Sequence, residues 1–132
     1  MSRIVEALNR IAETDTIISE DLSLKAINKI NKAAWGEDAL NIVLNNTSDK
    51  LDGYDDFGSG FDVSYQGSIK ELLSEIIDIY SKAGIKIRKE GKNKISYDNG
   101  DQTVYITVVS DDDASTYTKN SQGYFIYVDN VE

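Results

Sequence analysis

The clearest pattern of apolar and polar positions in the chain lies between residues 68 and 84. Apolar side chains recur there at helical spacing and form one broad stripe, made of Ile69, Leu72, Leu73, Ile76, Tyr80 and Ala83. Ser68 and Glu71 have the spacing of a capping box, and Gly84 stands where a left-handed C-terminal cap is expected. Burial of the four Leu and Ile side chains would stabilise the fold by at most about 6–12 kcal/mol. The pattern predicts a central amphipathic helix over residues 68–83.

Two helices are expected before this segment. Residues 2–13 carry apolar side chains at helical spacing, and a break follows them. A second helix is expected from about Ser19 or Glu20 to Trp35, with Leu24 directed inward, Gly36 as its stop and Trp35 as a lid on the core. The N-terminal part of the chain, about 2–36, is therefore predicted to be helical.

The stretch between these helices and the central helix gives a weaker signal. Residues 39–45 fit both a strand and a short helix, and the helix is slightly favoured. Residues 45–60 are rich in Gly, Ser, Asn and Asp, which favour turns over regular structure. We expect a long irregular loop there, and loops of this length are usually functional or mobile.

Alternation of apolar and polar residues predicts strands on both sides of the central helix. The segments are 61–65, a strand beginning at Ile85 and Ile87, one around Ile95 and Tyr97, 102–109, and 124–128. The Asn99-Gly100 pair is a strong hairpin signal. We therefore expect one α+β domain over residues 1–132, in which an antiparallel meander of about four to five strands, within about 61–128, packs against the central helix.

Composition narrows the chemistry that the protein can perform. The chain of 132 residues has neither cysteine nor histidine, so it lacks a thiol nucleophile, the commonest zinc ligand and the usual general base. We expect a protein that is not an enzyme and needs no cofactor or metal. No apolar run is long enough to span a membrane, and charge appears too early for a secretory signal, so a cytoplasmic protein is expected.

The net charge of −9 is unevenly distributed along the chain. Residues 37–78 contain ten acidic and two basic side chains, and residues 98–132 contain seven acidic and one basic. Residues 82–94 are the opposite, with six basic side chains and one acidic. A net acidic surface repels nucleic acid and attracts basic partners, so direct nucleic-acid binding is not expected.

The acidic residues of the predicted loop are the first candidates for binding. Two sets of residues are proposed as partner contacts: Asp49, Asp52, Tyr54, Asp55, Asp56 and Asp62, and a second set of Asp111, Asp112 and Asp113. Clustered carboxylates can hold calcium, but the EF-hand spacing is absent, and no base or cation suggests a magnesium-dependent site. Carboxylates with interleaved aromatic side chains can instead engage a basic groove, or solvation alone can account for them.

The basic segment 82–94 is the second candidate. Lys86, Arg88 and Lys94 are expected on the exposed side of a hairpin. Lysines on an edge strand are an ordinary protection against edge-to-edge aggregation, and this explanation is preferred to contact with an acidic protein or with nucleic acid.

The leading hypothesis is a non-catalytic acidic binding protein that occupies a basic surface of a partner, such as a nuclease or another nucleic-acid-binding protein. Size and charge, and no sequence motif, make it comparable to phage-encoded inhibitors of host defence, such as anti-CRISPR proteins, and to toxin-immunity proteins. The alternative is an assembly protein that forms a homo-oligomer through an exposed strand edge at residues 124–128.

Overall fold

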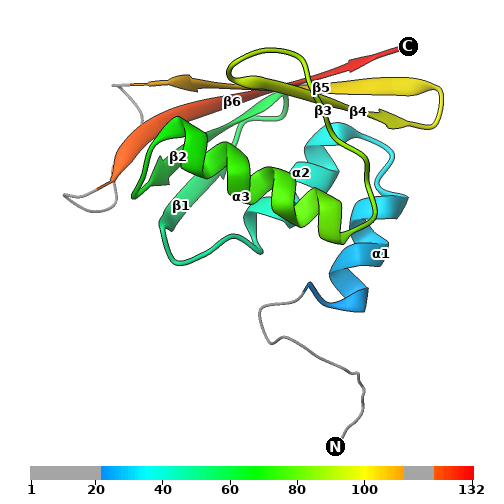
Figure 1. The fold of residues 1–132 in the computed structure, drawn as a ribbon, viewed down its shortest axis with the longest axis horizontal. Helices are drawn as coiled ribbons and strands as arrows, with labels where there is room; N and C mark the ends of the chain where they lie inside the picture. Colours follow the sequence, from blue (N-terminus) through cyan, green and yellow to red (C-terminus); the bar gives the residue numbers. More distant parts are fainter. Residues whose placement is uncertain (1–21, 112–120) are drawn as a thin grey trace, which may run out of the picture.

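A computed structural model of the chain describes residues 22–111 and 121–132 (Figure 1). Within them the order of elements is α1 (Leu24–Lys32), α2 (Gly36–Leu44), β1 (Leu51–Asp56), β2 (Gly60–Tyr65), α3 (Ile69–Lys82), β3 (Arg88–Lys89), β4 (Lys94–Asn99), β5 (Gln102–Ser110) and β6 (Gln122–Val131). The predicted helix over 2–13 lies outside the described residues. The protein has the predicted α+β fold.

The strands form a single antiparallel sheet in the order β1-β2-β6-β5-β4-β3. Strands β3 to β6 are a meander, and the β1–β2 hairpin joins it through the pairing of β2 with β6. The described part of the sheet has six strands rather than four to five, because residues 51–56 form β1. The predicted edge at residues 124–128 is wrong: β6 lies between β2 and β5, and therefore offers no free edge for assembly.

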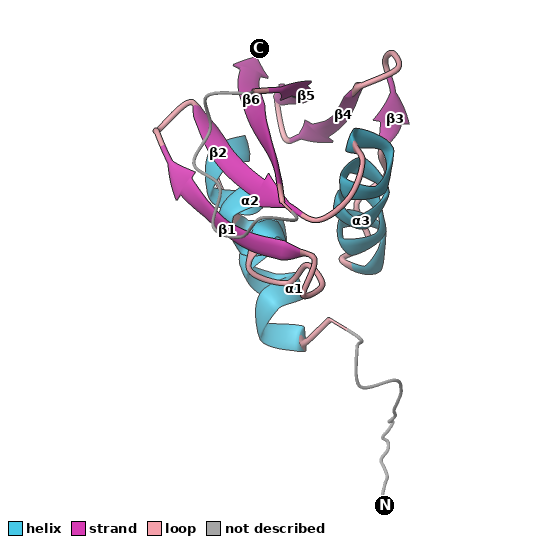
Figure 2. Ribbon diagram, turned by 90° about the vertical axis from the view of Figure 1, so that its left-hand side faces the viewer, coloured by secondary structure: helices cyan, strands magenta, loops and turns pink. Residues whose placement is uncertain are grey.

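The described helices lie on one side of the sheet, which curves around them (Figures 1 and 2). Alternate residues of the strands point towards the helices and form the core with α2 and α3. The largest fully buried side chains are Tyr65, Tyr80, Phe61, Leu40, Leu44, Leu72, Ile76, Ile95, Ile106 and Ile126. The other side of the sheet, which we call the outer face, is not covered by any described helix.

The structure confirms the sequence signals of the central helix. Ser68 accepts a hydrogen bond from the Glu71 backbone N–H, and the Glu71 side chain accepts one from the Ser68 N–H, which completes the capping box. Gly84 has a φ of 83°, the left-handed conformation that favours glycine at a helix end. Leu72, Leu73 and Ile76 are buried as predicted.

The second predicted helix is wrong at both ends. α1 begins at Leu24, after the Ser23 cap, and ends at Lys32. Leu24 is 77% exposed, and Trp35 is 53% exposed instead of covering the core. Gly36 starts α2 rather than ending a helix. It also lies close to the sheet, since a Cβ there would stand 2.4 Å from Val104 Cγ1.

The irregular loop predicted over 45–60 is also wrong. Leu51 and Tyr54 face the core side, and β1 pairs with β2 along its length, interrupted by a bulge between Leu51 and Gly53. Cross-strand pairing therefore outweighs the turn-forming tendency of Asp and Gly. By contrast, the strand predicted from Ile85 is reduced to Arg88–Lys89, and residues 39–45 are helical up to Leu44, as favoured.

Candidate binding face

The outer face carries carboxylates at the end formed by β1, β2 and β6. Directly paired residues of antiparallel strands point to the same side of a sheet. Asp55 of β1 pairs with Asp62 of β2, and Asp62 pairs with Phe125 of β6. The register thus places two acidic residues beside an aromatic one, on the side opposite the helices.

Asp111 joins this group from the far end of β5. Its backbone N–H donates to the Gly123 carbonyl of β6, and Gly123 has no side chain to separate Asp111 from β2. Partial burial raises the pKa of the Asp62 carboxyl, and a hydrogen bond with Asp111 and the charges of Asp111 and Asp55 raise it further. The two acidic segments of the sequence therefore meet at Asp62.

Aromatic rings lie next to these carboxylates. The Phe57 and Phe125 ring centroids are 6.4 Å apart, and those of Phe125 and Tyr127 are 4.6 Å apart. Phe57 is 60% exposed and Tyr127 is 51% exposed. Large apolar side chains that are exposed together indicate an interaction surface, whereas isolated ones are common on any protein. The rings and the carboxylates of Asp62 and Asp111 line one shallow hollow of about 560 Å³.

Gly60 allows the Phe125 ring to lie across β2. A Cβ at residue 60 would stand 2.5 Å from Phe125 Cε2 and 2.7 Å from the Ile126 carbonyl oxygen. A side chain at this position would displace the ring and disturb the pairing of β2 with β6. The aromatic row therefore depends on a glycine that sequence reasoning treated only as part of a loop.

We call this surface the acidic-aromatic end; it consists of Asp55, Phe57, Asp62, Asp111, Phe125 and Tyr127. Sequence reasoning predicted its three carboxylates and left its three rings out of the proposed contacts. The β-strand period around the buried Ile126 was the available signal, since it places residues 125 and 127 on the opposite side.

Tyr54 lies on the other side of the sheet. Its ring packs edge-on against Phe61 at 5.9 Å between centroids, and its hydroxyl oxygen lies 2.6 Å from Asn41 Oδ1 and 2.8 Å from Asn45 Oδ1. Burial raises the Tyr54 pKa. The structure therefore places Tyr54 between β1 and α2, away from the acidic-aromatic end.

The remaining predicted contacts are dispersed. Asp49 lies in the exposed turn before β1, and Asp52 Oδ1 accepts a hydrogen bond from Gln66 Nε2. Asp56 Oδ1 accepts from the Gly58 N–H in the β1–β2 turn. Asp112 and Asp113 lie outside the described residues. Of the nine predicted residues, the structure brings together Asp55, Asp62 and Asp111.

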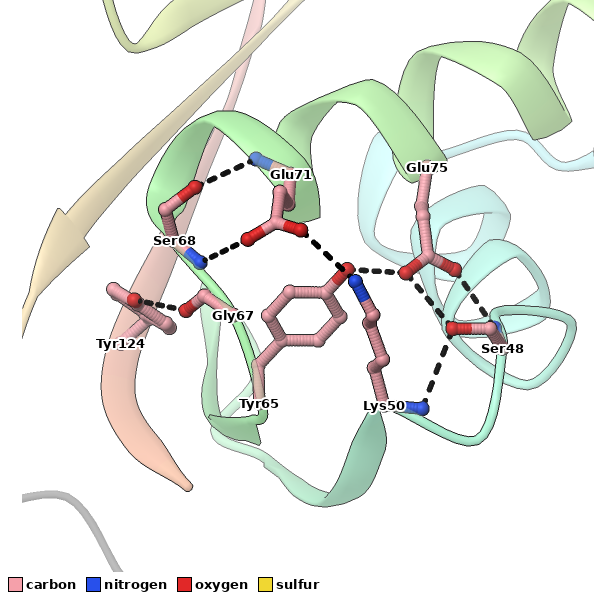
Figure 3. A network of polar contacts seen from close by, with 8 residues as sticks. All are labelled: Ser48, Lys50, Tyr65, Gly67, Ser68, Glu71, Glu75 and Tyr124. Carbon is pink, nitrogen blue, oxygen red and sulfur yellow. Dashed lines mark hydrogen bonds and ion pairs between the residues drawn. The ribbon is translucent and has the colours of Figure 1, made fainter. Parts of the chain in front are cut away.

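A polar network on the helix side anchors the β1–β2 hairpin (Figure 3). The Tyr65 hydroxyl donates to Glu75, and Glu75 also accepts from the Ser48 N–H at 2.8 Å. Lys50 Nζ lies 2.9 Å from Glu71 Oε2. Hydrogen bonds from the Ser68 backbone N–H and from Lys50 lower the pKa of Glu71 to about 2. These contacts attach the start of β1 and the end of β2 to α3.

At the other end of the outer face, basic side chains contact acidic or aromatic ones. Arg88 Nη2 lies 3.0 Å from Asp98 Oδ1, and Arg88 Nε lies 3.7 Å from Glu90 Oε2. Lys94 Nζ lies 4.9 Å from the centre of the Tyr105 ring, a cation–π contact. The Arg88 guanidinium lowers the pKa of Asp98. We call Arg88, Glu90, Lys94, Asp98 and Tyr105 the paired end.

In the part of the chain that the structure describes, no group of three or more acidic side chains is placed to hold a metal ion, and no helix is long and apolar enough to cross a bilayer. We found no protein-family model, curated protein or solved structure that matches this chain.

Proposed function

We propose that this protein is a non-catalytic binding protein that inhibits or neutralises a partner protein by occupying its basic, nucleic-acid-binding surface. The recognition surface is the acidic-aromatic end. The observation that carries the proposal is the meeting of Asp55, Asp62 and Asp111 beside the rings of Phe57 and Phe125.

The chemistry of this surface suits a cationic partner. Partial burial and the neighbouring acidic groups Asp111 and Asp55 raise the pKa of Asp62, and a cation brought beside this carboxyl would favour its charged form. Exposed aromatic rings provide apolar area at the centre of an interface, while charges at the rim guide association and specificity. In the complex, carboxylates take the positions of nucleic-acid phosphates, as in inhibitors of the anti-CRISPR or toxin-immunity kind.

The test compares capture of partners from a cell lysate by three forms of the full chain. The forms are the wild type, a Asp55→Lys/Asp62→Lys variant, and an Asp78→Lys/Asp101→Lys control with the same change in net charge at exposed positions outside the acidic-aromatic end. We expect the wild type and the control to capture a basic protein at low salt, and the Asp55→Lys/Asp62→Lys variant to lose it.

The captured protein is then tested for nucleic-acid binding with and without the wild-type chain. The proposal predicts competition between the chain and nucleic acid for one site. Equal capture by all three forms, or a captured protein whose nucleic-acid binding is unaffected, would contradict it.

A further inference from the structure

A cleft of about 700 Å³ lies between the first turn of α3 and the turn that joins β3 to β4. It is lined by Lys70 of α3, Lys89 of β3 and Lys92 of the turn, so three segments of the chain each contribute an ammonium group. We call it the lysine cleft. Its volume is within the range of small-molecule sites. A chain with a net charge of −9 therefore gathers positive charge around one cleft.

The lysine cleft lies on the helix side of the sheet. Lys89 pairs with Ile95, which is buried beneath the helices, and directly paired residues of antiparallel strands point to the same side. Tyr124, which also lines the cleft, donates its hydroxyl to the Gly67 carbonyl just before α3, at 2.6 Å. The cleft and the acidic-aromatic end are thus on opposite sides of the sheet, and this inference does not depend on the proposed function.

No acidic side chain lines the lysine cleft in the part of the chain that the structure describes. The acidic residues next to two of the lysines in sequence are engaged elsewhere. Glu71 accepts from the Ser68 N–H and pairs with Lys50 (Figure 3), and Glu90 accepts from the Ser96 hydroxyl. None of the ion pairs among the described residues involves the three lysines of the cleft. An anion that enters the cleft would meet all three ammonium groups.

We infer that the lysine cleft binds an oligophosphate group, such as a di- or triphosphate. The lysine ammonium is a compact point charge with three donors, and it is a common ligand of phosphate in proteins. A single carboxylate has one charge and two oxygens to offer, whereas an oligophosphate presents several charges and many oxygens, enough for three lysines at once. The Asn93 amide, which also lines the cleft, adds a neutral donor.

The cleft also has apolar surface beside its charges. Half-buried Ile69 and buried Tyr124 line it together with the lysines. Sites for small molecules combine apolar surface with a few polar groups that fix the orientation of the ligand. An oligophosphate has two sources, an inorganic ion or an organic molecule such as a nucleotide, and only the organic molecule gains from contact with the apolar part.

The experiment titrates the isotope-labelled full chain with inorganic triphosphate, with adenosine triphosphate and with malonate, and follows backbone amide signals by NMR. We expect both phosphates to shift signals of residues 68–70 and 89–93. Malonate, a dicarboxylate with fewer charges and fewer oxygens, should bind more weakly at the same place.

Two variants with the same change in net charge locate the site. Lys70→Gln/Lys89→Gln removes two ammonium groups from the cleft and should weaken triphosphate binding by about tenfold or more, the effect of lost hydrogen bonds to a charged group. Lys29→Gln/Lys86→Gln changes exposed lysines that do not line the cleft and should leave binding within about twofold. A well-dispersed spectrum establishes that each variant is folded.

The outcomes decide both the site and the source of the phosphate. Tighter binding of adenosine triphosphate than of inorganic triphosphate, with the difference lost in Ile69→Ala, would support an organic ligand. Equal binding of the two would support an inorganic one. Malonate binding as tightly as triphosphate, equal weakening in both lysine variants, or no shift at residues 68–70 and 89–93 would overturn the inference and leave the proposed function in place.

Discussion

The two ends of the outer face both carry carboxyl groups beside aromatic rings, but the pKa of a carboxyl is lowered at one end and raised at the other. At the paired end, Arg88 lies 3.0 Å from Asp98 Oδ1 and lowers that carboxyl's pKa. At the acidic-aromatic end, Asp62 has acidic neighbours, Asp55 and Asp111, and its pKa is raised. At the paired end an opposite charge favours the ionised carboxyl of Asp98, whereas at the acidic-aromatic end partial burial and neighbouring acidic groups disfavour the ionised carboxyl of Asp62. A carboxyl whose pKa is perturbed in this way is a candidate for a functional site.

The largest expected effect is a difference in stability between substitutions on the two faces of β6. Ile126 is fully buried on the helix side of β6, so Ile126→Ala should lower the free energy of unfolding by about 2–5 kcal/mol. Its neighbour Phe125 lies on the outer face, and Phe125→Ala should lower it by about 0.5–1.5 kcal/mol, the value of an aromatic pair. Urea unfolding of both variants measures the difference, and a larger loss for Phe125→Ala would show that the outer face belongs to the core.

Reversing a charge should weaken partner binding when it is made at the acidic-aromatic end, and should leave binding nearly unchanged when it is made at the paired end. Asp62→Lys should weaken binding of the captured basic partner by about tenfold or more, since truncation or reversal in a buried charge pair typically has effects of this size. Arg88→Glu disrupts the ion pairs of the paired end and should leave the affinity within about twofold. Calorimetric titration provides both affinities. If Arg88→Glu weakens binding as much as Asp62→Lys, the interface extends over the whole face.

Neutralising Asp62 should stabilise the free protein. Because its pKa is raised in the folded state, ionisation of Asp62 disfavours folding at neutral pH. Asp62→Asn should therefore raise Tm at pH 7, and the advantage should diminish as the pH falls through the raised pKa and disappear well below the unfolded pKa of about 3.9, where the wild-type carboxyl is protonated in both states. Thermal unfolding across this pH range tests the prediction. A lower Tm for Asp62→Asn at pH 7 would mean that the carboxylate is stabilised by its surroundings.

Glu71 should show the opposite dependence on pH, with a smaller effect because the pair is exposed to solvent. Its pKa is lowered to about 2 by the Ser68 N–H and Lys50, so its contribution to stability is present above the unfolded pKa of about 4.3 and is lost as the pH falls towards 2. Glu71→Gln should be less stable than the wild type at pH 6 and approach it near pH 2. Urea unfolding at several pH values measures this, and a constant difference would assign the effect to packing.

Local signals in the sequence were sufficient for the central helix and for the β4–β5 hairpin. The Ser68–Glu71 capping box, Gly84 and the Asn99-Gly100 turn each specify a conformation through a few neighbouring residues, and the structure contains all of them. β1 was missed because its stability comes from pairing with β2 and from Tyr54 on Phe61, neither of which appears in its own composition. Local sequence patterns therefore did not predict the strand that depends on long-range pairing.

The acidic residues of the candidate site could be predicted from the sequence, but their arrangement in space could not. The acidic segments were visible, but their meeting at Asp62 depends on β6 inserting beside β2, a long-range pairing that places Gly123 between β2 and Asp111. The aromatic row depends on the same pairing and on Gly60 beneath Phe125. Strand order, rather than any motif, creates the surface.

Site-specific photo-cross-linking tests the central claim most directly. A photoreactive phenylalanine is placed at residue 125, in the acidic-aromatic end, or at residue 105, in the paired end of the same face, and each full-length chain is irradiated in a cell lysate. The account predicts that residue 125 cross-links to a basic protein and that added salt or Asp62→Lys abolishes the product, whereas residue 105 gives none. Cross-linking from residue 105 alone, or a product at residue 125 that is unaffected by salt and by Asp62→Lys, would contradict it.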